Sequence, residues 1–199
     1  ASVRYEYDER GNLVKESYYG LDGKPVFCSD GYASLEVEYD ERGNFVKVTF
    51  LGIDGFPVIN TDGGCACIQF KYDENDNKIE ANYYDSLGQP CLILNGYAVV
   101  KLEYNENNIQ IKESYFDTEY KPILSKDGFA SMENEYDTRG NLIKESYFDV
   151  GGNLITIIDG YASVECEYDE RGNCIKIKFF GTDKLPILTV DGYASLEFE

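Results

Sequence analysis

Hydrophobic and polar residues alternate over a short stretch at the start of the chain. Val3, Tyr5 and Tyr7 are separated by polar neighbours. The alternation recurs at Leu35, Val37 and Tyr39 and at Val164, Cys166 and Tyr168. Period-two patterning with one polar face is typical of a half-buried β-strand. The pattern therefore predicts strands through residues 2–7, 34–39 and 163–168.

A hairpin turn is predicted directly after each of these strands. Asp8 suits the first position of a type I turn, and Gly11 can supply the positive φ that closes a hairpin with a bulge. The fourth copy, 104–108, lacks the glycine and is expected to be one residue shorter. We expect a different turn there, with asparagine supplying any left-handed position. A returning strand is predicted around Val14 and Tyr18.

Lysines fall on the polar face of the returning strands. Glu6 and Lys15 should then face each other across the first hairpin, as should Glu38 and Lys47. Cross-strand pairs of this kind contribute roughly 0.2–1 kcal/mol each.

The whole strand–turn–strand pattern repeats. Tyr7-Asp8-Glu9-Arg10-Gly11-Asn12 returns at Tyr39 and Tyr168, and looser copies begin at Tyr72, Tyr104 and Tyr136, at spacings of 32 or 33 residues. A fixed period in this range is the signature of a repeat architecture. It predicts one repeat array over residues 1–199, with units 1–32, 33–65, 66–97, 98–129, 130–161 and 162–193 and a stub at 194–199.

The rest of each unit adds an aromatic pair, a second turn that usually contains proline, a short apolar run and an Asp-Gly turn. Three strands per unit are therefore expected, in an all-β, elongated array of tandem β-hairpins with no helix. An antiparallel meander would reverse successive units, whereas a solenoid would rotate them. Because every unit keeps the same alternation, a β-solenoid-like path is favoured. The sequence begins at a unit boundary and ends inside the first strand of a seventh unit, so we expect a segment of a longer protein, with flanking repeats or domains.

Composition narrows the classes of function. The net charge is −19, which disfavours nucleic acid and anionic membranes as partners. No apolar run reaches membrane-spanning length, so no membrane insertion is expected. Histidine is absent, which rules out Ser-His-Asp or Cys-His catalysis within these residues. Paired carboxylates recur with the period, as scaffold residues do. The sequence therefore predicts a non-enzymatic segment.

The cysteines and the acidic turns are the candidate metal ligands, and simpler roles explain both. The six cysteines share no repeat position and lack a short-spaced zinc pattern, so we interpret them as small apolar core residues. The acidic turns could bind Ca²⁺, but one turn supplies too few oxygen ligands. We therefore expect no metal and no cofactor.

The aromatic pairs are the candidate binding positions. Adjacent strand residues face opposite sides, so one ring of each pair can point inward and the other outward. The outward rings would form a stripe on which a sugar or a quaternary amine could stack. In the alternative, both rings pack against the adjacent unit. The candidate ligand-binding residues are Tyr19, Tyr84, Phe116, Phe148 and Phe180.

The repeated Tyr-Asp-Glu-Arg-Gly-Asn motif followed by an apolar strand resembles the tyrosine-aspartate repeats of bacterial secreted and surface proteins. The stretch 18–25 is also similar to the aromatic hairpin repeats of choline-binding and clostridial toxin-type cell-wall-binding modules. Choline-type sites use tryptophan, which is absent here, and the period is longer than in those modules. The resemblance implies tandem β-hairpins and a bacterial extracellular or cell-surface location.

The expected function is a non-catalytic binding or adhesion platform for a glycan or cell-wall polymer. Two alternatives stay open. One is a purely structural stalk or spacer that presents another domain. The other is an accessory segment of an enzyme or toxin whose catalytic domain lies elsewhere.

Overall fold

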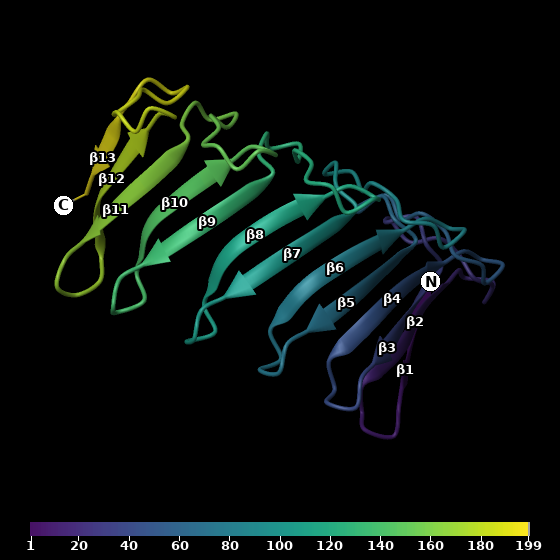
Figure 1. Cartoon of the computed structure of the whole chain (residues 1–199). Coiled ribbons are helices and arrows are strands. Elements are labelled where there is room, and N and C mark those ends of the chain that lie inside the picture. Colours follow the sequence, from purple (N-terminus) through teal and green to yellow (C-terminus); the bar gives the residue numbers. More distant parts are fainter. Residues whose placement is uncertain (199) are drawn as a thin grey trace. The chain divides into compact units, whose positions relative to one another are not determined.

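The computed structural model describes residues 1–198, and within that range β-strands are the only long regular elements. The strands follow the chain in order within one antiparallel sheet (Figure 1). They are β1 (Ser2–Tyr7), β2 (Leu13–Tyr19), β3 (Ser34–Tyr39), β4 (Phe45–Leu51), β5 (Cys67–Tyr72), β6 (Lys78–Tyr84), β7 (Val99–Tyr104), β8 (Gln110–Phe116), β9 (Ser131–Tyr136), β10 (Leu142–Phe148), β11 (Ser163–Tyr168), β12 (Cys174–Phe180) and β13 (Ser195–Glu197). The predicted all-β array of tandem hairpins is confirmed.

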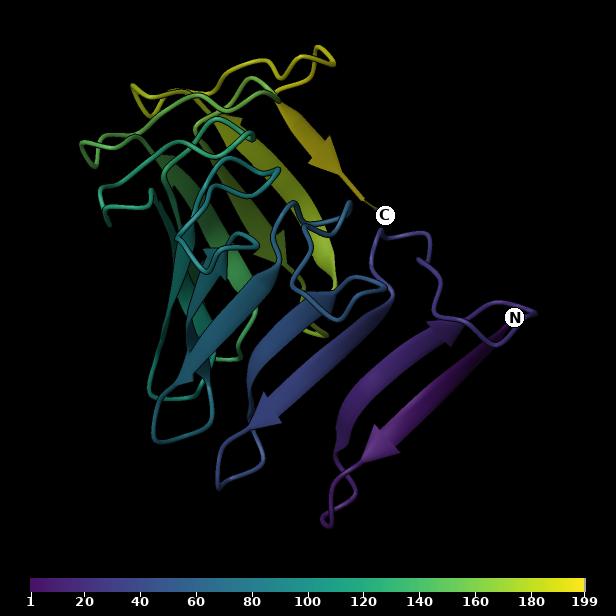
Figure 2. The ribbon, with the colours of Figure 1, turned by 90° about the vertical axis from the view of Figure 1, so that its right-hand side faces the viewer.

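The chain divides into two compact blocks. The N-terminal block comprises residues 1–100 with 117–120, and the C-terminal block comprises 101–116 with 121–199. Within the N-terminal block, hairpins β1–β2 and β3–β4 run in the same direction, with their tight turns at the same end (Figure 2). The predicted stub at 194–199 contains β13, and its last residue, Glu199, lies outside the described residues.

Each repeat unit contributes two strands to the sheet, not the three that we expected. The apolar run after the second turn makes only an isolated bridge, from Pro25 to Tyr19 in the first unit and at equivalent places in the next five. The fifth unit has Leu154 in place of the proline and makes the same isolated bridge, so proline alone does not explain why this run is not a strand. With two strands per unit, a meander does not reverse successive units. The sheet therefore follows a meander path, and the equal alternation of the units does not require a solenoid.

The hairpin turn is built around the carboxylate of its aspartate. Asp8 Oδ1 accepts hydrogen bonds from the backbone N–H groups of Arg10 and Asn12, at 2.9 and 2.8 Å, and Oδ2 accepts one from Asn12 Nδ2 at 3.0 Å. Gly11 has φ +87° and donates its N–H to the Asp8 carbonyl at 3.0 Å. The register of β1 against β2 shifts at the turn, as a bulge requires. This confirms the predicted bulged hairpin.

The turn of the fourth unit corrects one expectation. It has the same length as the others, and the Asn108 N–H donates to the Asn105 carbonyl at 2.9 Å. Asn105 Oδ1 accepts the N–H groups of Asn107 and Ile109 as aspartate does elsewhere. Asn108 takes the left-handed place of glycine with φ +59°, so asparagine preserves the turn.

The core of each block is a row of rings on one face of the sheet, which we call the aromatic ladder. The first ring of an aromatic pair alternates with the ring that precedes the next unit's alanine, at centroid separations of 4.9–6.0 Å. Aromatic pairs add about 0.5–1.5 kcal/mol each beyond burial. The members are Tyr18, Tyr32, Phe50, Tyr83 and Tyr97 in the N-terminal block, and Tyr115, Phe129, Tyr147, Tyr161, Phe179 and Tyr193 in the C-terminal block.

Carboxylates on the ladder face are explained by the tyrosines beside them. Tyr18 donates its hydroxyl to Glu16 at 2.6 Å, and Tyr115 donates to Glu113 at 2.9 Å. The hydrogen bond to the Glu16 carboxylate raises the pKa of Tyr18. Where the ladder ring is Phe50 or Phe179, the residue two places earlier is apolar, Val48 or Ile177.

The Asp-Gly turn that ends a unit contacts the third segment of the next unit. The Leu94 N–H donates to the Gly63 carbonyl at 3.1 Å, and equivalent bonds run from Thr61 to Asp30 and from Val190 to Asp159. A Cβ on Gly64, which has φ +78°, would lie 2.9 Å from Leu94 Cγ. A Cβ on Gly11 would meet nothing within 4 Å. Gly64 therefore serves both the turn and the close approach of two units.

Gly64→Ala should lower the free energy of unfolding more than Gly11→Ala. Both substitutions place alanine in a left-handed conformation, which costs about 1–2 kcal/mol of stability. Only Gly64→Ala adds a clash, for which about 1–3 kcal/mol more is expected. Denaturant unfolding of the two variants measures the difference, and equal losses would contradict a close contact between units at Gly64.

The turn carboxylates should make stability fall in acid. The side chain and backbone N–H of Asn141 donate to Asp137 and hold its pKa below the ordinary value, and the backbone N–H of Asn12 does the same for Asp8. Because the folded pKa is depressed, this stabilisation is complete above about pH 4 and is lost as the pH falls through the folded pKa.

Asn105 makes the same backbone hydrogen bonds in the fourth turn as aspartate makes in the others. A variant with asparagine in place of the turn aspartates should therefore fold; these are Asp8, Asp40, Asp73, Asp137 and Asp169. Unfolding free energies from pH 5 to pH 2 should fall less steeply for this variant than for the parent. Comparing the two slopes separates the turn carboxylates from the general relief of negative charge. Parallel slopes would show that these carboxylates contribute nothing.

Candidate polar-face binding site

The second ring of each aromatic pair lies on the face opposite the ladder. Tyr18 faces Val3 across the first hairpin, whereas Tyr19 faces Ser2. Phe148 and Phe180 likewise lie opposite serines, Ser131 and Ser163. We call this surface, which also carries the lysines and glutamates of the strands, the polar face. The five candidate rings Tyr19, Tyr84, Phe116, Phe148 and Phe180 are all half-buried on it.

Two of the five candidate rings are covered by cations of the same block. The Arg4 guanidinium lies 4.3 Å from the centroid of Tyr19, and Lys101 Nζ lies 5.1 Å from the centroid of Phe116. These are cation–π contacts. In both places the ring is occupied by the protein's own side chain.

Ion pairs join neighbouring hairpins across the polar face. The lysine of a second strand pairs with the glutamate of the next first strand, at 2.7 Å for Lys15–Glu36 and Lys112–Glu133 and 3.3 Å for Lys144–Glu165. Lys176 and Glu197 form the same pair. Glu6 does face Lys15 in the register, but Lys15 Nζ bonds Glu36.

The Glu38–Lys47 pair was predicted within its hairpin and is present at 2.6 Å. The following strand explains this exception, because β5 carries Gln69 opposite Lys47 in place of a glutamate. Lys47 therefore turns back to its own hairpin.

The third hairpin reverses the charges. Lys71 lies in the place of Glu38 and Glu80 in the place of Lys47, and the two pair at 2.7 Å. Glu80 is buried and also accepts the amide of Asn82 at 2.8 Å. The Tyr120 hydroxyl lies 2.6 Å from Asn82 Oδ1 and 3.2 Å from Glu80 Oε1. Burial opposes ionisation of Glu80, but these bonds outweigh it and lower its pKa.

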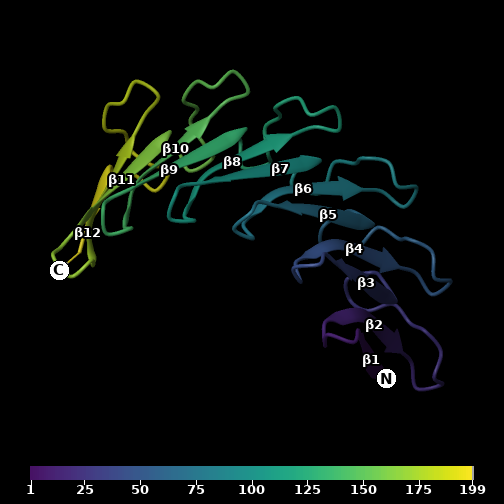
Figure 3. The ribbon, with the colours of Figure 1, turned by 60° about the horizontal axis from the view of Figure 1, so that its bottom comes forward.

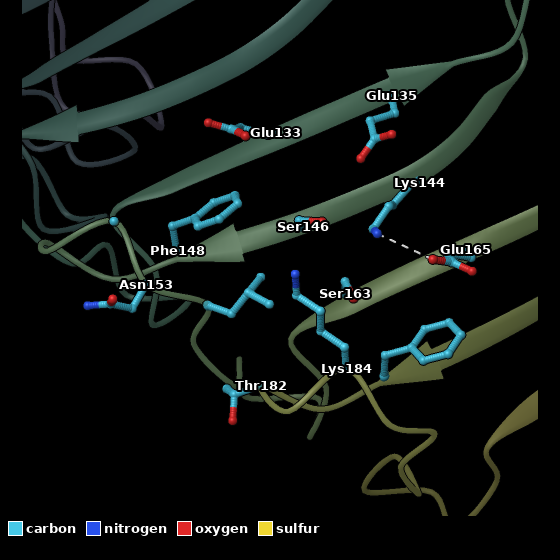
Figure 4. Close-up of a pocket in the computed structure, with 13 residues that line it drawn as sticks. Glu133, Glu135, Lys144, Ser146, Phe148, Asn153, Ser163, Glu165, Thr182 and Lys184 are labelled. Atoms are coloured by element: carbon cyan, nitrogen blue, oxygen red, sulfur yellow. Dashed lines mark ion pairs between the residues drawn. The ribbon is translucent and has the colours of Figure 1, made fainter.

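A hollow of about 800 Å³ opens on the polar face of the C-terminal block (Figure 4). The rings of Phe148 and Phe180 line it. Lys144 of β10 is paired with Glu165 of β11, the strand between β10 and β12 (Figure 4). The connections that follow β10 and β12 lie at the same end of these strands (Figure 3) and contribute Asn153, Leu154, Thr182 and Lys184. The remaining lining residues are Glu133, Glu135, Ser146, Gly152 and Ser163.

Lys184 breaks the repeat pattern at the edge of this hollow. The left-handed position of the second turn is glycine in four units, Gly23, Gly55, Gly88 and Gly152, but Tyr120 and Lys184 in the others, with φ +62° and +63°. A left-handed non-glycine residue costs about 1–3 kcal/mol and is often linked to function. Tyr120 lines a second hollow, of about 400 Å³, beside Tyr84. In both places the substituted residue projects from the loop over the polar face.

The cysteines form no disulfide in the described part of the chain. Burial raises the pKa of Cys65 to about 11, and Cys65 occupies the ladder position before Ala66. The described residues contain no group of three or more acidic, cysteine or histidine side chains placed to hold a metal ion. They also contain no helix long and apolar enough to cross a membrane.

Sequence reasoning predicted that the five rings face away from the inward rings, but not how they are grouped. The structure brings Phe148 and Phe180 together in one hollow, puts Tyr84 in another, and leaves Tyr19 and Phe116 under cations. Sequence reasoning did not identify Lys184 and Tyr120 as residues that line the hollows. Both stand at a position that is glycine in the other units, and this departure was visible in the sequence.

The chain is similar to solved structures only at low sequence identity. No family model matches the chain, and no curated protein matches it. Among solved structures, the TcdB2-TccC3-TEV and TcdB2-TccC3 crystal structures are each 13% identical, with TM-scores of 0.43 and 0.39. The Photorhabdus luminescens Tc holotoxin pore is 14% identical, with a TM-score of 0.38. These matches cover 88–89% of this chain but only 9–11% of those chains, so the chain spans about a tenth of their length. Similarity at this level does not establish a family.

Proposed function

We propose that the chain is a non-catalytic repeat module of a bacterial surface or secreted protein that binds a carbohydrate or cell-wall polymer. The binding site is the hollow between Phe148 and Phe180. The observation that carries the proposal is the grouping of these two candidate rings in one hollow of about 800 Å³.

The lining of the hollow suits a sugar chain. Ligand sites combine apolar and aromatic surface with a few well-placed polar groups. Phe148, Phe180 and Leu154 supply the apolar surface, and the Asn153 amide oxygen supplies an acceptor, while its Nδ2 donates to Asp149 Oδ2 at 3.3 Å. Glu135 and Lys184 have no ion-pair partner among the described residues, so their charges are available to sugar hydroxyls.

The absence of catalysis is part of the proposal. Histidine is absent from the sequence, and the carboxylates of the polar face are mostly held in ion pairs that recur along the chain. A repeated, neutralised carboxylate is a poor general acid or base, since catalysis needs a group whose pKa is tuned for proton transfer.

The second candidate function is a spacer that presents another domain. It is favoured by the same ion pairs, which satisfy most of the polar face internally, and by the cations over Tyr19 and Phe116. The third candidate function is an accessory segment of a toxin or enzyme. Such a segment could act either as the binding module or as the spacer.

A binding screen against bacterial polysaccharides and peptidoglycan fragments tests the proposal. The variant Phe148→Ala with Phe180→Ala should lose at least about tenfold in affinity, because stacking surface is removed from both sides of the hollow. The matched control is Phe27→Ala with Phe56→Ala, which removes two exposed loop rings of the N-terminal block, 52% and 70% exposed.

Circular dichroism would establish that both variants are folded. Unchanged affinity in the Phe148/Phe180 variant would exclude the hollow as the site. If the parent binds no member of the screen, the spacer function replaces the proposal.

A further inference from the structure

The outer edge of β1 has the side chains of an internal strand without the neighbour that covers them. Among the described residues, β1 pairs only with β2. Val3, Tyr5 and Tyr7 are 41%, 53% and 61% exposed. The equivalent residues of β3 are half-buried, because β2 lies beside β3. An open edge is a template for another strand.

Three kinds of contact join an internal first strand to the preceding second strand, and β3 and β11 have all three. The first comes from the repeated tyrosine, whose hydroxyl donates to a carbonyl at the start of that strand. The bonds are Tyr39 to Leu13 at 3.0 Å, Tyr72 to Phe45 at 2.9 Å, Tyr136 to Gln110 at 3.0 Å and Tyr168 to Leu142 at 2.9 Å. Tyr7 is the same residue of β1, and its hydroxyl has no partner among the described residues.

The second contact joins the hairpin turns. The arginine of one turn donates to carbonyls of the next, as in Arg10 to Glu41 at 3.1 Å, Arg42 to Asp73 at 3.0 Å and Arg139 to Glu170 at 3.1 Å. The backbone of Glu9 has the position of Glu41 in the first turn. It can therefore accept an arginine from a unit placed beside β1.

The third contact is the ion pair between hairpins, and here β1 differs. Lys15 of β2 faces Glu36 of β3 in the register and bonds it at 2.7 Å. The residue of β1 that corresponds to Glu36 is Arg4. A second strand with lysine at the Lys15 position would place two cations opposite each other, which is destabilising.

The chain itself contains a second strand of the opposite type. β6 carries Glu80 where β4 carries Lys47, because Glu80 faces Lys71 just as Lys47 faces Glu38. In the sequence, the first strand that follows β6 carries Lys101 at the place of Glu36. The repeat thus contains an acid-bearing second strand followed by a first strand that is basic at the same place.

We infer that the edge of β1 is a docking surface for one kind of partner, a further hairpin unit of this repeat whose second strand bears a carboxylate at the Lys15 position. Arg4 pairs with that carboxylate, the Tyr7 hydroxyl bonds the first carbonyl of the strand, and the Glu9 carbonyl receives the arginine of the incoming turn. A lysine-bearing unit is disfavoured at the same edge.

Two fusions made from the chain's own units test this inference. Unit 66–97, with Glu80 and with Asn75→Arg to supply the turn arginine, or unit 130–161, with Lys144 and Arg139, is placed directly before Ala1 of the whole chain. Both new junctions copy natural ones, since Tyr97 and Tyr161 each precede an alanine in the sequence. Hydrogen exchange of the β1 amides is measured at low salt in both fusions, with β9–β12 as the internal reference for an intact fold.

Unit 66–97 should slow exchange of the β1 amides about fivefold more than unit 130–161 does. Arg4→Glu should reverse the order, since it converts the edge to the ordinary type. The inference is overturned if neither fusion protects β1 while β9–β12 exchange normally. It is equally overturned if Arg4→Glu leaves the order unchanged, which would show that backbone pairing alone decides docking.

Discussion

Aromatic rings that pack against each other at a tilt across unit borders connect neighbouring hairpins. Tyr32 shows the arrangement, because it contacts Tyr18 of its own unit at 5.9 Å and Phe50 of the following unit at 5.0 Å. An isolated two-stranded hairpin is at best marginally stable in water. The ladder supplies the missing hydrophobic layer one unit at a time, so no unit has a complete core without a neighbour.

Using one face for the ladder leaves the other face for polar contacts. Because side chains alternate along a strand, the same hairpin that presents Tyr147 to the ladder presents Phe148 to the polar face. There, lysine–glutamate pairs join neighbouring units, and loop residues such as Lys184 reach over the strands. The hollow in the C-terminal block is therefore a consequence of the repeat, modified by one substitution at a position that is usually glycine.

The strands and hairpin turns could be predicted from sequence because their signals are local. Alternation gave β1 and β3, and the Asp8–Gly11 turn was recognisable from the residues that it requires. The third segment was mistaken for a strand because an apolar run does not reveal whether its backbone finds a partner. The ladder was missed because Tyr18 and Tyr32 meet only once the chain has folded back. Whether Tyr19 and Phe116 would be covered depended on Arg4 and Lys101, which only the strand register could place.

Adjacent residues on opposite faces allow a direct test of the ladder as the source of stability. Tyr147 is 7% exposed and contacts Phe129 and Tyr161, at 4.9 and 6.0 Å, whereas Phe148 lines the hollow. The measurement is the free energy of unfolding of Tyr147→Ala beside that of Phe148→Ala. The ladder account predicts a loss of about 3–5 kcal/mol for Tyr147→Ala and a clearly smaller loss for Phe148→Ala. Equal losses, or a larger loss for Phe148→Ala, would contradict it.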